Sequence, residues 1–337
     1  MNVVLLEVSH WHAPLYFDAL EAAGVTIIGV SDRHGPTAER VARRFGTRPY
    51  ADWRDLLNRE QPEFAFAFGT HRQMPAIGEA LIERRIPFVL EKPCGLTASD
   101  VRRLHERAGD LGLFVGVPLV QTFGPLATLV EDSVRVRGPR HLWFRFIAGP
   151  PSRYPAAGSG WMLDPAESGG GCFINLSGHF VELALRVLPD VLRIWARMSN
   201  AVYGERIEDY ALVALEGSDG STATVEMGYL FPSETGRPRE VYFSSFGRQG
   251  CQVWWGDRAA SAAHGQPWGE SAANLDSDSL YHRFVVATLE AFRRGAPPPV
   301  ALDVMVRVME VIDAAYRSAR TGQPVTVEVP GLGAKHV

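Results

Sequence analysis

A lysine and a histidine stand in the two segments of the sequence whose residue types and spacing best suit chemistry. The first segment is Glu91, Lys92 and Pro93, which follows directly after the apolar run Phe88–Leu90. A lysine held before a proline at the end of a buried strand could give a substrate hydroxyl a positive charge or a hydrogen bond. The tripeptide is a weak signal by itself, because surface lysines are far commoner than catalytic ones.

The second segment is the glycine run Gly169–Gly171, which is followed by apolar residues at helical spacing. This periodicity places Asn175 and His179 four residues apart, on one face of a helix. A histidine there can act as an acid or base, and an amide can orient it or bind substrate. A lone histidine on a helix is usually structural, so the interpretation depends on its pairing with the Lys92 motif.

The loop after the first apolar run, Val3–Leu6, lies where a dinucleotide-binding chain carries its glycines. Glycine there permits a tight turn and lets backbone N–H groups approach a pyrophosphate. The alignment of this loop with the glycine pattern is ambiguous by one residue, so the three glycine positions fall on Glu7, Ser9 and His12 or on Val8, His10 and Ala13. In either alignment only one of the three positions holds a small residue, which is Ser9 in the first and Ala13 in the second. His10 or His12 could donate a hydrogen bond to a phosphate, line a substrate pocket, or only make hydrogen bonds with the backbone.

Two further strand ends carry candidate cofactor contacts. Asp32 stands about 20 residues beyond the first turn, where a carboxylate accepts hydrogen bonds from the ribose hydroxyls of NAD. Its neighbour Arg33 could instead pair with the 2′-phosphate of NADP, and Asp32 could merely cap the next turn. Gly69, Thr70 and His71 follow the third run, and small residues there let a cofactor lie across the strand end. We therefore expect NAD, with NADP as the alternative.

The elements that must position these residues form two patterns. Over residues 1–120, short apolar runs alternate with amphipathic segments, as in βαβ units of a parallel sheet covered on both faces. From about residue 139, longer alternating strands indicate a half-exposed antiparallel sheet, and helices over Leu280–Arg294 and Leu302–Arg317 close the chain. We expect one domain over residues 1–120 and a second over residues 121–330. Residues 331–337 are expected to fray. The irregular segment Gly149–Gly171 contains Tyr154 and Trp161, whose aromatic rings could contact a ligand or only pack within the loop.

Composition excludes several classes of protein. The 337 residues correspond to about two domains, and 34 Lys and Arg against 38 Asp and Glu argue against nucleic acid as a partner. Cys94, Cys172 and Cys251 are too few and too scattered for a disulfide framework, which favours a reducing cytoplasm. No stretch reaches the ~18 apolar residues of a membrane span, and the N-terminus lacks the basic region of a signal peptide. We expect a soluble cytoplasmic protein.

Together these motifs resemble the Gfo/Idh/MocA family of NAD(P)-dependent oxidoreductases, over nearly the whole chain. The closing stretch Phe284–Val327 adds the family's Ser-x-x-x-Gly-x-Pro-Val ending, here Ser318, Gly322, Pro324 and Val325. The resemblance implies an α/β fold class: an N-terminal Rossmann parallel sheet and a C-terminal α+β domain with a large open, mostly antiparallel sheet. It implies that residues 1–120 bind the dinucleotide and that residues 121–330 bind the substrate and form the oligomer. It also implies a nicotinamide cofactor, hydride transfer to or from a hydroxyl-bearing carbon of a sugar, cyclitol or related polyol, and a homo-oligomer formed through the open sheet.

In such enzymes Lys92 would bind the substrate and His179 would exchange the hydroxyl proton. The predicted catalytic residues are Lys92, His179 and Asn175; the predicted substrate contacts are Tyr154 and Trp161; the predicted cofactor contacts are Ser9, His10, His12, Ala13, Asp32, Arg33, Gly69, Thr70, His71, Glu91 and Lys92.

Two departures from the family pattern support a rival interpretation. The family's aspartate, four residues before the histidine, is Asn175 here, which cannot carry the negative charge that supports a protonated His179. The dinucleotide glycines are also missing. The rival is a non-catalytic ligand-binding or regulatory protein that keeps the fold. A third interpretation, a metal-dependent lyase or hydrolase using His10, His12 and His71, has no recognisable ligand spacing, and we predict no metal.

Overall fold

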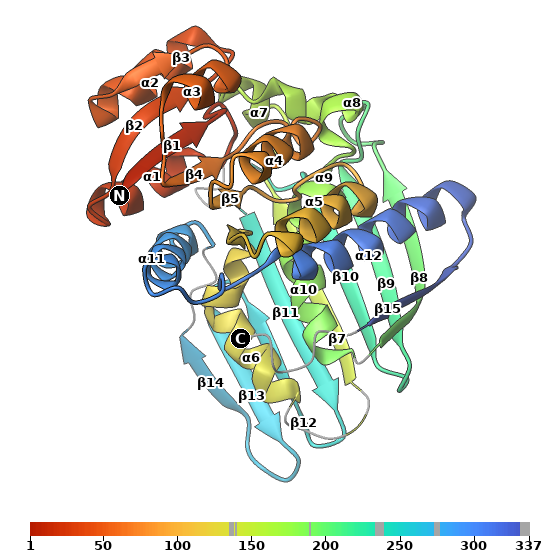
Figure 1. Cartoon of the computed structure of the whole chain (residues 1–337). Helices are drawn as coiled ribbons and strands as arrows, with labels where there is room; N and C mark the ends of the chain where they lie inside the picture. Colours follow the sequence, from red (N-terminus) through yellow and green to blue (C-terminus); the bar gives the residue numbers. More distant parts are fainter. Residues whose placement is uncertain (135–137, 139, 189, 233–238, 273–276, 331–337) are drawn as a thin grey trace. The chain divides into compact units, whose positions relative to one another are not determined.

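The structure is a computed structural model that describes residues 1–134, 138, 140–188, 190–232, 239–272 and 277–330 (Figure 1). The expectation for residues 331–337 lies outside the described residues. The chain forms two compact units, and each unit is assembled from three stretches of sequence. Unit 1 comprises Met1–Pro118, Tyr154–Gly169 and Asp278–Val306, and unit 2 comprises Leu119–Arg153, Gly170–Ser277 and Arg307–Val337.

Unit 1 is built on a parallel sheet with the strand order β3-β2-β1-β4-β5-β6. Its strands are β1 (Asn2–Leu6), β2 (Thr26–Ser31), β3 (Arg48–Tyr50), β4 (Phe64–Ala67), β5 (Phe88–Leu90) and β6 (Val115–Gly116). Every residue of β4 is fully buried, because helices cover both faces of the sheet, and this explains the continuous apolar run. The strand order reverses between β1 and β4, and such a sheet binds ligands beside that point, at the carboxyl ends of the strands.

Helices surround this sheet and fix the loops at the strand ends. They are α1 (Pro14–Ala22), α2 (Gly35–Phe45), α3 (Trp53–Arg59), α4 (Met74–Glu83), α5 (Ala98–Asp110), α8 (Pro165–Ser168) and α11 (Leu280–Arg293), with the 3-10 turn η2 (Gly160–Leu163). The side chains of Thr97 and Asp100 form a capping box at the start of α5, as their spacing predicts. Helix α11 is remote from α1 in sequence but packs against it.

Unit 2 is built on a mixed sheet with the strand order β14-β13-β12-β11-β7-β10-β9-β8-β15. All its strand pairs are antiparallel except β7 with β10, so the prediction of a mostly antiparallel sheet is confirmed. The strands are β7 (Arg140–Ala148), β8 (Asp190–Ser199), β9 (Tyr210–Gly217), β10 (Thr222–Gly228), β11 (Arg239–Gly247), β12 (Gly250–Trp255), β13 (Arg258–Ala263), β14 (Gly269–Ala272) and β15 (Val325–Pro330).

Helices lie over one face of this second sheet, where α9 and α10 contact β7, β9 and β10 (Figure 1). The remaining helices and turns are η1 (Val120–Phe123), α6 (Pro125–Val134), α7 (Arg153–Ala156), α9 (Cys172–Leu176), α10 (Gly178–Val187) and α12 (Leu302–Thr321). The single helix predicted after the glycine run is divided at Ser177, since serine and glycine are both poor helix formers. Buried Arg186 on α10 pairs with Glu182 at 2.6 Å and with Glu131 of α6 at 3.2 Å, which joins the two helices.

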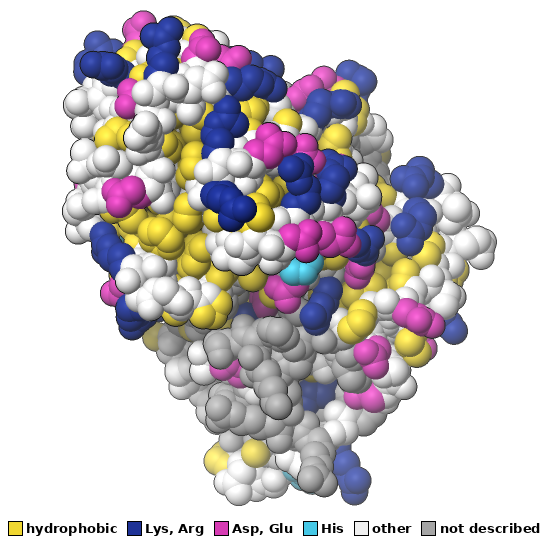
Figure 2. All heavy atoms as spheres, viewed as in Figure 1, with side chains coloured by type: hydrophobic (Ala, Val, Ile, Leu, Met, Phe, Trp, Pro, Cys, Tyr) yellow, Lys and Arg dark blue, Asp and Glu magenta, His cyan; other side chains and the backbone are white. Residues whose placement is uncertain are grey.

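The visible face of the molecule carries basic, acidic and apolar side chains interspersed, with no broad field of one charge (Figure 2). Ion pairs such as Arg103 with Glu79, at 2.7 Å between α5 and α4, contribute to this pattern. Among the described residues, no helix has the length and apolar character needed to cross a membrane.

Candidate functional site

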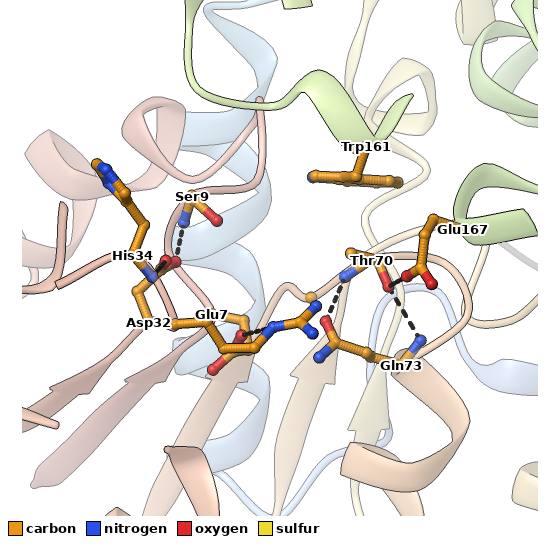
Figure 3. A pocket seen from close by; sticks show the side chains of 10 residues that line it. Glu7, Ser9, Asp32, His34, Thr70, Gln73, Trp161 and Glu167 are labelled. Atoms are coloured by element: carbon orange, nitrogen blue, oxygen red, sulfur yellow. Dashed lines mark hydrogen bonds and ion pairs between the residues drawn. The ribbon is translucent and has the colours of Figure 1, made fainter. Parts of the chain in front are cut away.

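A pocket of about 300 Å³ opens in unit 1 at the carboxyl ends of β1, β2 and β4 (Figure 3). Three strand-end loops and the η2–α8 segment supply its walls. The lining residues are Glu7, Ser9, Asp32, Arg33, His34, Gly69, Thr70, Gln73, Trp161 and Glu167. Five of the predicted cofactor contacts and the predicted substrate contact Trp161 therefore lie around one cavity, beside the point where the strand order reverses.

Glu7 has a left-handed backbone with φ of 59°, a conformation that favours glycine. Its N–H donates to the carbonyl oxygen of Ser31 at 2.8 Å, which ties the loop to the end of β2. A left-handed turn at residue 7 fits the register in which Glu7, Ser9 and His12 replace the glycines. Burial raises the pKa of the Glu7 carboxyl to about 7, and the nearby Asp32 charge acts in the same direction while Arg33 opposes both.

The Asp32 carboxylate joins two loops of the pocket. It accepts hydrogen bonds from the backbone N–H groups of Ser9 and of His34, the latter at 2.7 Å (Figure 3). Asp32 therefore does cap the turn before α2, and it also lines the pocket. Both roles are compatible because each carboxylate oxygen offers two lone pairs, so the oxygens can still accept from a ligand hydroxyl.

The far wall of the pocket is held by Thr70, Gln73 and Glu167. The Thr70 hydroxyl donates to Glu167 Oε2 at 2.8 Å, and the Thr70 N–H donates to Gln73 Oε1 at 3.1 Å (Figure 3). The Trp161 ring lies above this pair in the same view. Sequence reasoning missed His34, Gln73 and Glu167. Gln73 could have been predicted, because it stands three residues after Thr70, the spacing of a capping pair. No local sequence signal predicts that Glu167 lies here.

A buried polar cluster occupies the ends of β1 and β5, beside Lys92. Glu91 Oε1 accepts the Tyr16 hydroxyl at 3.0 Å and lies 3.1 Å from His12 Nδ1. His12 Nδ1 is also 3.0 Å from the hydroxyl of Tyr281, which α11 brings from the far end of the sequence. The Lys92 N–H donates to Glu91 Oε2 at 2.7 Å, and the Lys92 side chain is almost fully buried. Burial raises the pKa of the Glu91 carboxyl, with Lys92 opposing.

Among the described residues, His10, His12 and Glu91 form a group whose ligating atoms lie within 4.8 Å of one another, as a metal site requires. Two of these groups already have protein donors: His10 Nδ1 accepts the His12 N–H at 3.1 Å, and Glu91 accepts the Tyr16 hydroxyl. The expectation that no metal binds stays a prediction.

His71 and Tyr154 are both fully buried. His71 Nδ1 lies 2.7 Å from the carbonyl oxygen of Ser168 and its ring packs against Trp161. Tyr154 packs its ring against the edge of Trp11, and offers no exposed ring face. Ala13, also buried, precedes α1 as its N-cap residue. The predicted contacts of Tyr154 with a substrate and of Ala13 with a cofactor stay predictions.

The predicted residues of unit 2 lie on the two halves of the divided helix. Asn175, on α9, donates its side-chain N–H to the Tyr229 hydroxyl at 2.9 Å and is buried. His179 lies on α10 and is partly exposed. The structure thus gives Asn175 a partner within unit 2, and the meeting of Lys92 and His179 around one hydroxyl stays a prediction.

The glycine run has a packing role in unit 2. A Cβ on Gly170 would lie 2.1 Å from the Tyr316 hydroxyl, and a Cβ on Gly171 would lie 2.1 Å from the carbonyl oxygen of Glu208. The Glu208 carboxyl accepts the Tyr316 hydroxyl at 2.7 Å and the Phe173 N–H at 3.0 Å. Only glycine allows this close approach, so the run positions the start of α9.

Comparison with known proteins identifies relatives of both halves of the chain. The family model described as "Oxidoreductase family, NAD-binding Rossmann fold" matches residues 9–118, and the model "GFO/IDH/MocA C-terminal domain" matches residues 139–250. D-apiose dehydrogenase of Paraburkholderia graminis is 25% identical over 93% of this chain and 85% of that protein. Rhizopine catabolism protein MocA of Rhizobium meliloti is 21% identical over 88% of each.

Solved structures share the whole fold. An oxidoreductase from Agrobacterium radiobacter, in complex with NAD+, L-tartaric acid and magnesium, has a TM-score of 0.84 at 18% identity, covering 97% of this chain and 98% of that one. A levoglucosan dehydrogenase in complex with NADH and levoglucosan has a TM-score of 0.82 at 15% identity, covering 98% and 99%. At these identities the likeness shows a common fold.

Proposed function

Because the chain belongs to the Gfo/Idh/MocA family of oxidoreductases and carries its NAD-binding Rossmann domain, we propose that it transfers hydride between NAD and a secondary hydroxyl of a sugar, cyclitol or related polyol. The observation that carries this proposal is the pocket at the carboxyl ends of β1, β2 and β4, with Asp32 in its wall. The relatives named for D-apiose and levoglucosan support a sugar as the substrate class.

The residues of the pocket fit a dinucleotide in two respects. Asp32 ends β2, where its carboxylate can accept from both ribose hydroxyls, which favours NAD over NADP. Gly69 has a left-handed backbone with φ of 73° and lies in the pocket wall at the end of β4, where its backbone can contact a ligand. Glu7 replaces a glycine, but its pKa near 7 leaves much of the carboxyl uncharged at neutral pH, which limits repulsion of a pyrophosphate.

Bound NAD would supply the hydride acceptor, and the chain's own residues would bind the substrate and move the proton. Lys92 would hold the reacting hydroxyl through its ammonium group, which favours the developing alkoxide. His179 would take the hydroxyl proton, and Asn175 would orient the substrate or the ring. Because Asn175 is uncharged, it cannot favour a protonated His179 as an aspartate would.

The test of this proposal is a calorimetric titration of the protein with NAD and with NADP, followed by turnover on a panel of sugars and cyclitols. We expect NAD to bind more tightly than NADP and at least one panel member to reduce it. His105→Gln, an exposed change on α5, is the control and should leave both properties intact. Absence of binding by either cofactor at millimolar concentration would refute the proposal.

The rival function, a ligand-binding protein without redox activity, is favoured by Glu7 in the glycine position and by Asn175 in place of an aspartate. It predicts polyol binding with no reduction of NAD by any panel member. The same titration and turnover assay separate the two functions.

We also propose a cytoplasmic homo-oligomer formed through the open face of the unit 2 sheet. That face exposes Trp143 on β7 and Trp195 on β8, which are 42% and 39% accessible, whereas the neighbouring side chains Phe144 and Ile194, on the opposite face, are buried. Large exposed aromatic side chains on one sheet face are typical of a protein interface, and a second copy presents the same surface. Cys94, Cys172 and Cys251 are all free, which suits a reducing compartment.

A further inference from the structure

The tautomer of His71 is fixed by its backbone contact. Its Nδ1 lies 2.7 Å from the carbonyl oxygen of Ser168, and a carbonyl oxygen can only accept, so Nδ1 carries the proton. Burial lowers the pKa of the His71 ring to about 3, and the charge of Lys92 acts in the same direction. The ring is therefore neutral at neutral pH, and its Nε2 presents a lone pair.

The tautomer of His10 is the opposite one. Its Nδ1 lies 3.1 Å from the backbone nitrogen of His12, which can only donate, so Nδ1 holds the lone pair. Burial lowers the pKa of the His10 ring well below its usual value, although the charge of Glu91 opposes this. The neutral ring therefore carries its proton on Nε2, which is a hydrogen-bond donor.

The two Nε2 atoms, one donor and one acceptor, lie in adjacent buried rings. Within the part of the chain that the structure describes, neither Nε2 has a hydrogen-bond partner. The ring centroids of His10 and His71 are 6.4 Å apart, and the Trp161 ring lies 5.5 Å from the first and 5.0 Å from the second. Buried polar atoms in native proteins have partners, so each of these two atoms is expected to have one in the working protein.

We propose that His10 and His71 together bind one hydroxyl oxygen of the polyol substrate, with His10 Nε2–H donating to it and His71 Nε2 accepting its proton. Two hydrogen bonds of about 2.8 Å that meet at a tetrahedral oxygen place the two nitrogens about 4.6 Å apart, a separation that rings with centroids 6.4 Å apart can provide. Trp161, against both rings, offers an apolar face to the adjoining C–H groups of the substrate.

The pairing of a donor with an acceptor selects the chemistry of the ligand. A phosphate oxygen would need donors from both rings, and a metal ion would need a lone pair from both. A hydroxyl group both accepts and donates, and so does water. Since the Lys92 charge acts on both histidines, this hydroxyl would lie close to the one that Lys92 holds. The inference deepens the proposed function by naming a substrate-positioning pair.

The first test needs no substrate. Nitrogen-15 NMR of the wild-type histidines, assigned with His10→Phe and His71→Phe, should find His10 protonated on Nε2 and His71 protonated on Nδ1 at neutral pH. The same tautomer in both rings, or a charged ring, would overturn the inference.

The second test uses glycerol as the simplest polyol probe, added to the protein in the presence of NAD. The Nε2 resonances of both histidines should shift with one common midpoint, and His71→Phe should weaken glycerol binding on the order of tenfold. His105→Phe, a matched change on the exposed face of α5, should leave the midpoint unchanged. If glycerol moves neither resonance, the pair holds only water and the inference is wrong.

The two proposals fail in different ways. NAD binding measured by calorimetry on the same samples tests the proposed function and does not involve the histidine pair. Normal NAD binding with no response to glycerol overturns the histidine site alone. If NAD does not bind, the hydride-transfer proposal falls, and the tautomers and the glycerol response still decide the histidine site.

Discussion

Replacing Glu7 by glutamine should make the protein more stable at high pH. Burial raises the pKa of the folded Glu7 carboxyl from 4.5 to about 7. The folded protein therefore keeps a proton that the unfolded chain releases between these pH values, so the free energy of unfolding falls as pH rises through that window. At about 1.4 kcal/mol per pH unit, the interval from 4.5 to about 7 corresponds to about 3 kcal/mol.

Glutamine keeps the size of the side chain and cannot ionise, so Glu7→Gln removes this dependence. The assay is urea unfolding of both proteins at a series of pH values from about 5 to about 8, with exposed Glu106→Gln on α5 as the control. We expect Glu7→Gln to exceed the wild type by about 2–3 kcal/mol at the upper end and by much less at the lower end. Parallel pH curves for the wild type and Glu7→Gln would refute the reasoning, because they would mean that Glu7 titrates alike in the folded and unfolded chain.

Three further predictions follow from the described contacts. Gly171→Ala should lower the free energy of unfolding by more than about 2 kcal/mol, because the new Cβ would lie 2.1 Å from the Glu208 carbonyl oxygen. The control Gly109→Ala, in open space on α5, should leave the free energy of unfolding unchanged or raise it. Urea unfolding measures both changes. His179→Ala should reduce turnover on the order of 10²–10⁴-fold while calorimetry shows NAD binding retained, and unchanged turnover would remove His179 from the mechanism. Trp195→Glu should shift the protein to a smaller species in sedimentation, since a buried unpaired carboxylate disfavours the sheet-face interface; an unchanged species would rule that interface out.

The parallel sheet could be predicted from sequence because its strands are apolar throughout. Strands β4 and β5 are buried on both faces, so their sequences are continuous apolar runs. The capping signal at Thr97 also predicted the start of α5 correctly. The edge strand β3 was missed, because it has only three residues, is largely exposed and shows no apolar run. Helix α6 was missed as well, although it packs against α10.

The candidate site was predictable where it depends on strand ends, and not where it depends on distant segments. Asp32 and Thr70 were found because parallel strands deliver their following residues to one edge. Glu167 and Tyr281 reach the pocket and the His12 cluster from remote parts of the chain, and no local pattern signals them.

The backbone at residue 7 shows a further limit. Its left-handed conformation is held by a hydrogen bond to Ser31, a tertiary contact that local sequence does not reveal. The division of roles at residue 120, with cofactor binding before it and substrate binding after it, stays a prediction.

The most direct measurement is a crystal structure of the protein soaked with NAD and with the panel sugar that it oxidises fastest. We predict ribose hydroxyls hydrogen-bonded to the Asp32 carboxylate, and one sugar hydroxyl within hydrogen-bond distance of both Lys92 Nζ and the His179 ring. A cofactor bound away from Asp32, or a sugar whose reacting hydroxyl contacts neither Lys92 nor His179, would contradict the account.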